Sequence, residues 1–269
     1  MPGIKFDGIE FYYELHGSAG PCLMLICGLG SHLDAWDVEL VEALSAKVRL
    51  ILFDNRGAGR SDKPDIEYSI AMHADDAAGL LDALGVANAH VLGASMGGMI
   101  AQEFALRHPQ KTASLILCCT APGGDNMVPP EPEVIETLAR VDGLTPEEIW
   151  RKNQPLSFTQ EFLDNNQAWL DRKMRRELPY TAPPFSFKRQ MTAAMRHNSF
   201  DRLPEIKCST LVMTGTEDIL IPPQNSELIA SRIPGAVLKQ YENLGHAFMT
   251  EARDAVVGDI LEFVHVNSA

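Results

Sequence analysis

No stretch of this sequence is apolar for the ~20 residues that a transmembrane helix needs. The longest apolar run, CLMLICGLG at residues 22–30, is far shorter. The first residues, MPGIKFDGIEFYYELHG, carry acidic side chains among the apolar ones and lack the charged start and continuous apolar segment of a secretory signal. We therefore expect a cytoplasmic protein without a membrane partner.

A surplus of positive charge is also missing. The chain has 36 acidic and 23 basic residues and a formal net charge of −13, so it would repel the phosphate backbone of a nucleic acid. Its one basic cluster, DRKMRREL at residues 171–178, alternates with acidic and apolar residues, and we interpret it as the solvated face of a helix. The composition thus predicts no nucleic-acid partner and leaves the oligomeric state open.

The cysteines are few, odd in number and without the C-x-x-C spacing of many metal and redox sites. Thiols in apolar, strand-like runs behave as small hydrophobic groups. The sequence therefore predicts neither a disulfide framework nor a zinc site, and we expect no metal and no cofactor. The cysteines are Cys22, Cys27, Cys118, Cys119 and Cys208.

Short apolar runs that end in turn-like segments recur along the chain. Residues 4–16 alternate in polarity around a glycine, which predicts an antiparallel hairpin at a sheet edge. The later runs lack this alternation, as is typical of parallel strands buried on both faces. Together they predict a doubly wound, mostly parallel α/β sheet. These runs are CLMLICG, VRLILFD, AHVLGAS, SLILCCT, STLVMTG and AVLKQYE.

Helices are predicted between these runs. Residues 75–84 begin with acidic side chains and are followed by Gly85, a common stop signal. Residues 98–108 run up to Pro109, which ends a helix. These positions fit helices that connect parallel strands.

The strand pattern is interrupted once, after the sixth predicted strand. Between residues 121 and 203 no strand-like run appears, prolines occur in pairs and several stretches have helical spacing. We therefore predict a helical cap at residues 121–203, inserted into a core formed by residues 1–120 and 204–269.

The sequence GASMG, at residues 93–97, places one serine between two glycines. The segment before it is strand-like and the segment after it is helical, which is the context in which a G-x-S-x-G serine serves as a nucleophile. Such a sharp turn leaves little room for side chains two residues before and two after the serine. We therefore predict that the hydroxyl of Ser95 projects from the carboxyl end of the sheet as a nucleophile.

A serine hydroxyl needs a base that removes its proton. His246, in ENLGHAFMTE, occupies a loop between the last predicted strand and the final helix, where such a base is expected. Asp218 directly follows the preceding strand and is the predicted partner that orients the imidazole and stabilises its charged form. Asp125, after the SLILCCT run, is the alternative acid.

Two backbone N–H groups are candidates to stabilise negative charge on a reacting oxygen. One belongs to Met96, directly after the predicted nucleophile, and the other to Leu29, in a glycine-rich loop after an early strand. An oxyanion hole built from these two donors needs no metal.

These segments resemble those of α/β-hydrolases of the small serine esterase and enol-lactonase type. The resemblance covers nearly the whole chain, and it implies the α/β-hydrolase fold. It also implies a catalytic triad of Ser95, Asp218 and His246, in that chain order, with Leu29 and Met96 as oxyanion donors. The resemblance rests on CGLGSHLDAW, FDNRGAGRSDKP, LGASMGGMIAQEFALRHP, LVMTGTEDILIPP and ENLGHAF.

One residue departs from this pattern, and one motif invites a different interpretation. Many relatives have a histidine where this chain has Cys27. The segment DNRGAGRS, at residues 54–61, resembles a structural turn of the family. It lacks the third glycine of a dinucleotide-binding loop, so we assign it to structure.

The resemblance implies a serine hydrolase that cleaves carboxylic esters of small to medium size, with a small-molecule ester or lactone as its partner. Three alternatives share these motifs: an enol-lactone hydrolase of aromatic degradation, a carbon–carbon bond hydrolase and a ligand-binding signalling protein of slow turnover. Dehalogenases and epoxide hydrolases of this fold carry an aspartate where this chain has Ser95, which argues against both.

Substrate choice is expected to depend on the cap and on nearby core loops. Apolar side chains there would favour an apolar acyl group. An inward-facing arginine from residues 172–176, or Arg196, would instead favour a substrate that carries a carboxylate. The predicted substrate-binding residues are Trp36, Met127, Phe162, Trp169 and Phe248.

Overall fold

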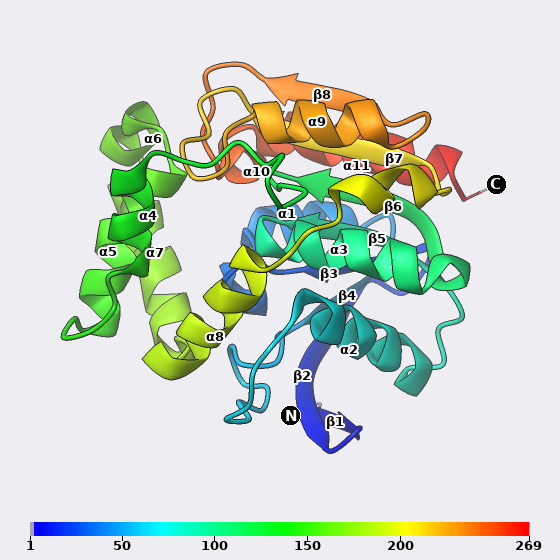
Figure 1. The fold of residues 1–269 in the computed structure, drawn as a ribbon, viewed down its shortest axis with the longest axis horizontal. Coiled ribbons are helices and arrows are strands. Elements are labelled where there is room, and N and C mark those ends of the chain that lie inside the picture. The colour runs from blue at the N-terminus through cyan, green and yellow to red at the C-terminus, as the bar shows by residue number, and fades with distance from the viewer. Residues whose placement is uncertain (1–2, 269) are drawn as a thin grey trace.

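One sheet of eight strands runs through the molecule in the computed structural model, which describes residues 3–268 (Figure 1). The strand order is β1-β2-β4-β3-β5-β6-β7-β8. Pairs β1–β2 and β2–β4 are antiparallel and the other pairs are parallel, so the predicted edge hairpin and mostly parallel sheet are confirmed. The strands are β1 (Gly3–Phe6), β2 (Ile9–His16), β3 (Cys22–Ile26), β4 (Arg49–Phe53), β5 (Ala89–Ala94), β6 (Thr112–Cys118), β7 (Thr210–Gly215) and β8 (Val237–Tyr241).

Helices of the core cover both faces of this sheet. None of the helices within residues 3–268 is long and apolar enough to cross a membrane. The core helices are α1 (Val38–Ser45), α2 (Ile70–Ala83), α3 (Met96–Arg107), α9 (Gln224–Arg232), α10 (Phe248–Glu251) and α11 (Arg253–Val266), and short 3-10 helices include η1 (Leu33–Ala35) and η4 (Phe200–Glu205).

Strand β3 illustrates why the central strands are apolar throughout. Leu23 and Leu25 pack in one cluster with residues of α1 and α11, while Met24 and Ile26 pack on the other face with residues of α2, α3 and α9. Successive side chains of a strand point to opposite faces, so a strand covered on both sides needs apolar residues at every position.

Helix α2 begins earlier than the sequence predicts. It starts at Ile70, where the Ser69 hydroxyl accepts a hydrogen bond from the backbone of the first turn, and not at Asp75. The two acidic residues at the predicted start form ion pairs with residues outside α2, and the Asp75 carboxylate accepts from Arg107 at 2.6 Å. Asp76 is buried and accepts two hydrogen bonds, of 2.6 and 2.7 Å, from the Arg56 guanidinium.

A helical insertion follows β6, as predicted. Figure 1 shows α4–α7 gathered beyond the end of the sheet toward which the arrows of β6 and β8 point. The assignment of residues 121–203 to a separate cap, with residues 1–120 and 204–269 as the core, stays a prediction. The inserted helices are α4 (Pro132–Ala139), α5 (Pro146–Ser157), α6 (Gln160–Asn165), α7 (Gln167–Glu177) and α8 (Pro184–Met195), with the 3-10 turn η3 (Leu178–Tyr180).

The sheet topology singles out one place for a ligand. Strand β3 pairs with β4 on one side and with β5 on the other, so the chain reverses its direction of winding at β3. Ligands of open α/β sheets bind outside the carboxyl ends of the strands at such a switch point. The loop after β3 and the turn after β5 meet there, and they contain Leu29 and Ser95.

Candidate active site

Ser95 lies in the sharp turn between β5 and α3. Its backbone angles, φ 57° and ψ −124°, are in a region that residues with a side chain rarely adopt. A Cβ added to Gly97 would lie 2.1 Å from the Ile26 carbonyl oxygen, and one added to Gly93 would lie 2.1 Å from the Gly97 carbonyl oxygen. Both glycines are therefore required by the close approach of backbone to backbone.

Strand β6 and the segment directly after it fix this turn from one side. The Ser95 N–H donates to the Cys118 carbonyl oxygen at 2.9 Å, and the Thr120 hydroxyl donates to the Ser95 carbonyl oxygen at 2.7 Å. A backbone in this region costs about 1–3 kcal/mol and persists only where its surroundings over-determine it. These bonds supply part of that constraint.

Asp218 and His246 are paired at the carboxyl ends of β7 and β8. Asp218 Oδ2 lies 2.7 Å from His246 Nδ1. The other oxygen, Oδ1, accepts from the backbone N–H groups of Leu220 and Ile221, each at 2.9 Å. Asp218 is buried, with 3% of its surface exposed, so this carboxylate is fixed in one orientation. Such a partner holds an imidazole in one tautomer.

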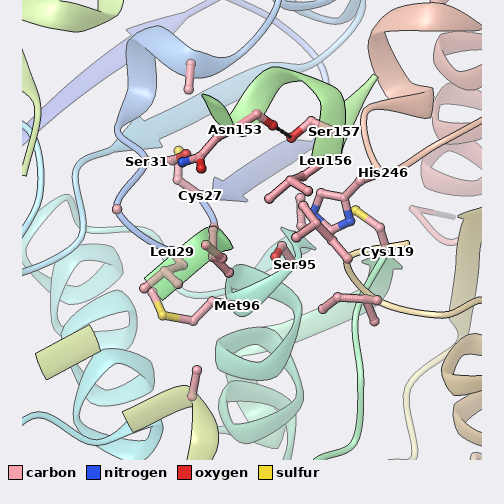
Figure 2. Close-up of a pocket in the computed structure, with 18 of the residues that line it drawn as sticks. Cys27, Leu29, Ser31, Ser95, Met96, Cys119, Asn153, Leu156, Ser157 and His246 are labelled. Atoms are coloured by element: carbon pink, nitrogen blue, oxygen red, sulfur yellow. Dashed lines mark hydrogen bonds between the residues drawn. The ribbon is translucent and has the colours of Figure 1, made fainter. Parts of the chain in front are cut away.

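Ser95 and His246 both line a cavity of about 720 Å³. Figure 2 shows Ser95 between Leu29 and Met96 on one side and His246 and Cys119 on the other. Within the described part of the chain, no hydrogen bond joins the Ser95 hydroxyl to the imidazole. Hydrogen bonds of this kind often tighten only when substrate binds.

The surroundings of His246 act on its basicity in opposite directions. Burial of the imidazole by itself would lower the pKa of His246. The negative charge of Asp218, the neighbouring Cys119 sulfur and their hydrogen bonds outweigh burial, so the pKa of His246 is raised well above its usual value. The site therefore favours a protonated imidazole.

Asp125, the alternative acid, lies elsewhere on the cavity wall. It is exposed, and within residues 3–268 it makes no hydrogen bond to His246. The geometry therefore favours Asp218 over Asp125 as the partner of the imidazole.

The sequence gives no sign that Cys119 lies beside the imidazole. A ligand atom from each of Cys119, Asp218 and His246 lies within 4.8 Å of the other two. These residues come from the ends of three strands, and no spacing in the sequence links them. The absence of a C-x-x-C motif therefore does not exclude a cluster of this kind.

The loop after β3 passes close to Ser95. A Cβ on Gly28 would lie 3.1 Å from the Ser95 Cβ and 3.5 Å from its Oγ. Leu29 and Met96 both line the cavity, and in the described part of the chain neither of their N–H groups has a hydrogen-bond acceptor. Two free backbone donors beside a hydroxyl are what an oxyanion hole requires.

Gln190 is a second residue that sequence analysis missed. It belongs to α8 of the insertion and has 0% of its surface exposed. Its Oε1 accepts from the Gly30 N–H at 2.9 Å, and its Nε2 donates to the Arg56 carbonyl oxygen at 2.8 Å. Gln190 thus ties the loop that carries Leu29 to the core. A lone glutamine in a helical stretch offers no signal of this role.

The DNRGAGRS segment is structural, as the sequence indicated. The Asp54 carboxylate accepts from the N–H groups of Leu33, at 2.8 Å, and Arg60, at 2.7 Å. The Asn55 side chain donates to the Cys27 carbonyl oxygen at 3.0 Å. This turn therefore holds the loop after β3 in place through hydrogen bonds to Cys27 and Leu33.

The structure divides the predicted substrate-binding residues. Trp36 and Met127 line the cavity. Phe162, Trp169 and Phe248 do not, and their assignment is corrected here because each is used in packing. Phe162 and Trp169 belong to a small aromatic cluster of the insertion, with ring centroids 5.5 Å apart. Phe248 is fully buried and stacks on Tyr241, with centroids 5.0 Å apart.

The basic cluster at residues 171–178 is not only a solvated face. The Arg176 guanidinium donates to the carbonyl oxygens of Asp34 and Trp36, each at 2.8 Å. Lys173 donates to the Ala35 carbonyl oxygen at 2.6 Å and pairs with Glu177 at 2.5 Å. The cluster is therefore not only solvated, because its cations donate hydrogen bonds to carbonyl oxygens in and beside η1 and so attach α7 to the core.

Comparison with known proteins agrees with this architecture. Residues 21–252 match the family described as the alpha/beta hydrolase fold. A protein of Azorhizobium caulinodans named as a candidate carbamate hydrolase, RutD, is 29% identical over 98% of each chain.

Two solved structures illustrate the likeness in three dimensions. An enol-lactonase from Burkholderia xenovorans LB400 has a TM-score of 0.86 at 27% identity and covers 98% of this chain and 100% of its own. A thermophilic esterase from Thermogutta terrifontis has a TM-score of 0.84 at 28% identity and covers 99% and 97%. The family match runs from β3 to α10 and includes Ser95, Asp218 and His246. By sequence and by architecture, this chain belongs to the α/β-hydrolase fold family.

Proposed function

We propose that this protein hydrolyses uncharged carboxylic esters through an acyl-enzyme on Ser95. One observation carries the proposal: Ser95, in its strained turn, lines the same cavity as His246. The Nδ1 atom of His246 lies 2.7 Å from the buried Asp218 carboxylate. A nucleophile, a base and an orienting acid at one cavity are the parts needed for acyl transfer.

In the proposed reaction the Ser95 side chain rotates toward His246, which removes its proton as the oxygen attacks the acyl carbon. Asp218 keeps the imidazole in the required tautomer and stabilises the imidazolium. The proton then passes to the leaving alkoxide, and the alcohol departs. Water repeats the sequence at the acyl-enzyme and releases the acid.

Negative charge on the acyl oxygen would be held by the N–H groups of Leu29 and Met96. Both line the cavity beside Ser95, and the helix dipole of α3 adds to the field at Met96. Such donors are each worth about 3 kcal/mol of barrier lowering in acyl-transfer enzymes.

The cavity wall supports an uncharged, apolar substrate. Its volume of about 720 Å³ is typical of a small-molecule site. Within residues 3–268, Lys173 is the one lysine or arginine that lines it, and Lys173 is already paired with Glu177. A substrate carboxylate would therefore find no free lysine or arginine among the described residues of the wall. The apolar wall from the insertion includes Val134, Ile135, Leu138, Ile149, Leu156 and Met195.

A lactone of aromatic degradation stays the alternative. The relatives named above carry names that refer to a carbamate, an enol-lactone and an ester at 27–29% identity. These similarities do not discriminate among substrates. The lack of a free lysine or arginine in the described wall argues against lactones that bear a carboxylate, but not against neutral lactones.

Steady-state hydrolysis of matched esters tests this proposal. We expect turnover of p-nitrophenyl esters of short to medium acyl chains by the wild type, and none by Ser95→Ala. The p-nitrophenyl ester of pentanoic acid should have a kcat/KM about tenfold or more above that of the glutarate mono-ester, which differs by a terminal carboxylate. A preference for the charged ester would contradict the assignment of an uncharged substrate.

The raised pKa of His246 predicts an unusual pH profile. Only the neutral imidazole can remove the Ser95 proton, so activity should be lost as the pH falls through the raised pKa of His246. We expect the acid limb of kcat/KM to lie above about pH 6.5, the ordinary value for histidine. Asp218 and Cys119 are the groups that raise this pKa, so Cys119→Ala should move the limb to lower pH. An acid limb below the ordinary value would contradict this account.

Gln190 should affect the rate more than substrate binding. In Gln190→Met the side chain keeps its shape but no longer binds the Gly30 N–H, so the Leu29 N–H loses its fixed direction. We expect kcat to fall about tenfold or more with little change in KM. Lys188→Met, on the exposed face of the same helix, is the matched control and should leave both constants unchanged. Equal effects of the two variants would argue against a positioning role.

A further inference from the structure

Cys119 is a third polar side chain beside the His246–Asp218 pair, and the proposed mechanism does not use it. It directly follows β6, and its φ of 42° lies in the left-handed region. Its N–H donates to the Met213 carbonyl oxygen at 2.9 Å, which fixes this turn. The residue is 3% exposed, yet it lines the cavity. Figure 2 shows its sulfur beside the imidazole of His246.

The three side chains offer a set of atoms that suits a metal ion. The Cys119 sulfur, a His246 nitrogen and an Asp218 oxygen lie within 4.8 Å of one another. In a tetrahedral zinc site, bonds of about 2.3 Å to sulfur and about 2.0 Å to nitrogen separate ligand atoms by roughly 3.5 Å. Asp218 is held by its backbone donors, so rotation of the Cys119 and His246 side chains would bring the three atoms around one ion. A thiolate with an imidazole favours zinc-like cations over magnesium or calcium.

We propose that Cys119, His246 and Asp218 form a binding site for a thiophilic divalent cation of the zinc class, and that this cation switches hydrolysis off. The binding half of this inference stands on the positions of the three side chains. The inhibitory half rests on the proposed function. The ion would reach the site through the cavity, which both Cys119 and His246 line, and a cavity water would complete its coordination.

Binding changes the protonation of the site in a defined way. The Cys119 thiol loses its proton to solvent, and a metal–sulfur bond forms. Where His246 is protonated, the imidazolium also releases one proton to solvent. The neutral imidazole then has one free lone pair, which binds the metal. The remaining ring nitrogen then carries the hydrogen, whichever nitrogen binds the ion. No base is left to deprotonate Ser95, so hydrolysis stops.

Cobalt(II) absorption tests the binding half without any reference to catalysis. Cobalt(II) added to metal-free wild-type protein should produce a thiolate-to-cobalt charge-transfer band that saturates at a single equivalent. Ser95→Ala should give the same band, because Ser95 is not a ligand. Because Ser95→Ala lacks the proposed nucleophile but keeps all three proposed ligands, its band tests metal binding whether or not the proposed function is correct. No charge-transfer band in folded wild-type protein would overturn the proposal.

Zinc inhibition tests the second half. Zinc chloride should inhibit ester hydrolysis by the wild type, and a chelator should restore it. In Cys119→Ala the zinc concentration for half-inhibition should rise by about tenfold or more, because a ligand is lost. Cys27→Ala is the matched control, since Cys27 is an equally buried cysteine that lines the same cavity on the side away from His246 (Figure 2). Equal zinc sensitivity of Cys119→Ala and the wild type would overturn the inhibitory role.

Discussion

Replacement of Ser95 by alanine is expected to lower kcat for ester hydrolysis by about 10⁴- to 10⁶-fold. The hydroxyl is the proposed site of the acyl-enzyme, and the proposed mechanism has no second nucleophile. The measurement is steady-state turnover of a p-nitrophenyl ester by wild type and Ser95→Ala at equal protein concentrations, determined by absorbance and not by active-site titration.

The stability of Ser95 variants separates this loss from misfolding. Ser95→Ala keeps a side chain at φ 57°, so its unfolding free energy should be close to that of the wild type. Ser95→Gly removes the side chain from this strained position and should raise the unfolding free energy by up to about 1 kcal/mol. Denaturant titration of the three proteins measures both. A stable Ser95→Ala protein with wild-type activity would show that another group attacks the ester.

Replacement of Asp218 by asparagine is expected to lower kcat by about 10⁴-fold. An amide in place of the Oδ2 carboxylate oxygen would not stabilise the imidazolium, and it could orient its own N–H toward His246 and favour the wrong tautomer. Loss of this charge also removes the main influence that raises the pKa of His246, so any residual activity should extend to lower pH. A pH series of kcat/KM for the variant measures both effects.

Asp125→Asn is the control for this assignment. Asp125 is exposed and lines the same cavity, but its side chain is not bonded to His246 in the part of the chain that the structure describes. We expect its variant to keep most of the wild-type activity. The reverse result, with Asp125→Asn inactive and Asp218→Asn active, would exchange their roles.

The fold was predictable because burial on both faces leaves a clear mark on each central strand. Every residue of β3 is buried, and the sequence there is continuously apolar. The start of α2 was not predictable in the same way. Of the two acidic residues at the predicted start, Asp76 forms a buried ion pair with Arg56 and Asp75 pairs with Arg107. Their charges therefore serve tertiary contacts and do not mark the beginning of the helix.

The site was predictable where the backbone constrains the sequence. Ser95 was found because its turn requires Gly93 and Gly97, and both requirements are local. Gln190 and Cys119 were not found, because their importance arises from contacts with residues distant in the sequence. Contacts of this kind cannot be predicted from a local sequence pattern.

The aromatic residues were the least predictable part. An aromatic side chain in the insertion can line the cavity or pack on its neighbours, and its sequence context is the same in both cases. Phe162 and Trp169 pack against Phe158. Apolar residues of α4 and α5 provide much of the wall instead. The sequence thus indicated that the insertion lines the cavity, but not which of its side chains do so.

The central claim is that Ser95 carries the acyl group during turnover. The most direct measurement is mass spectrometry of the protein quenched during hydrolysis of a p-nitrophenyl ester, followed by peptide mapping. We expect the mass of one acyl group on the peptide that contains Ser95, and no added mass on that peptide in Ser95→Ala. An acyl group on a different residue, or rapid turnover by Ser95→Ala, would contradict the account.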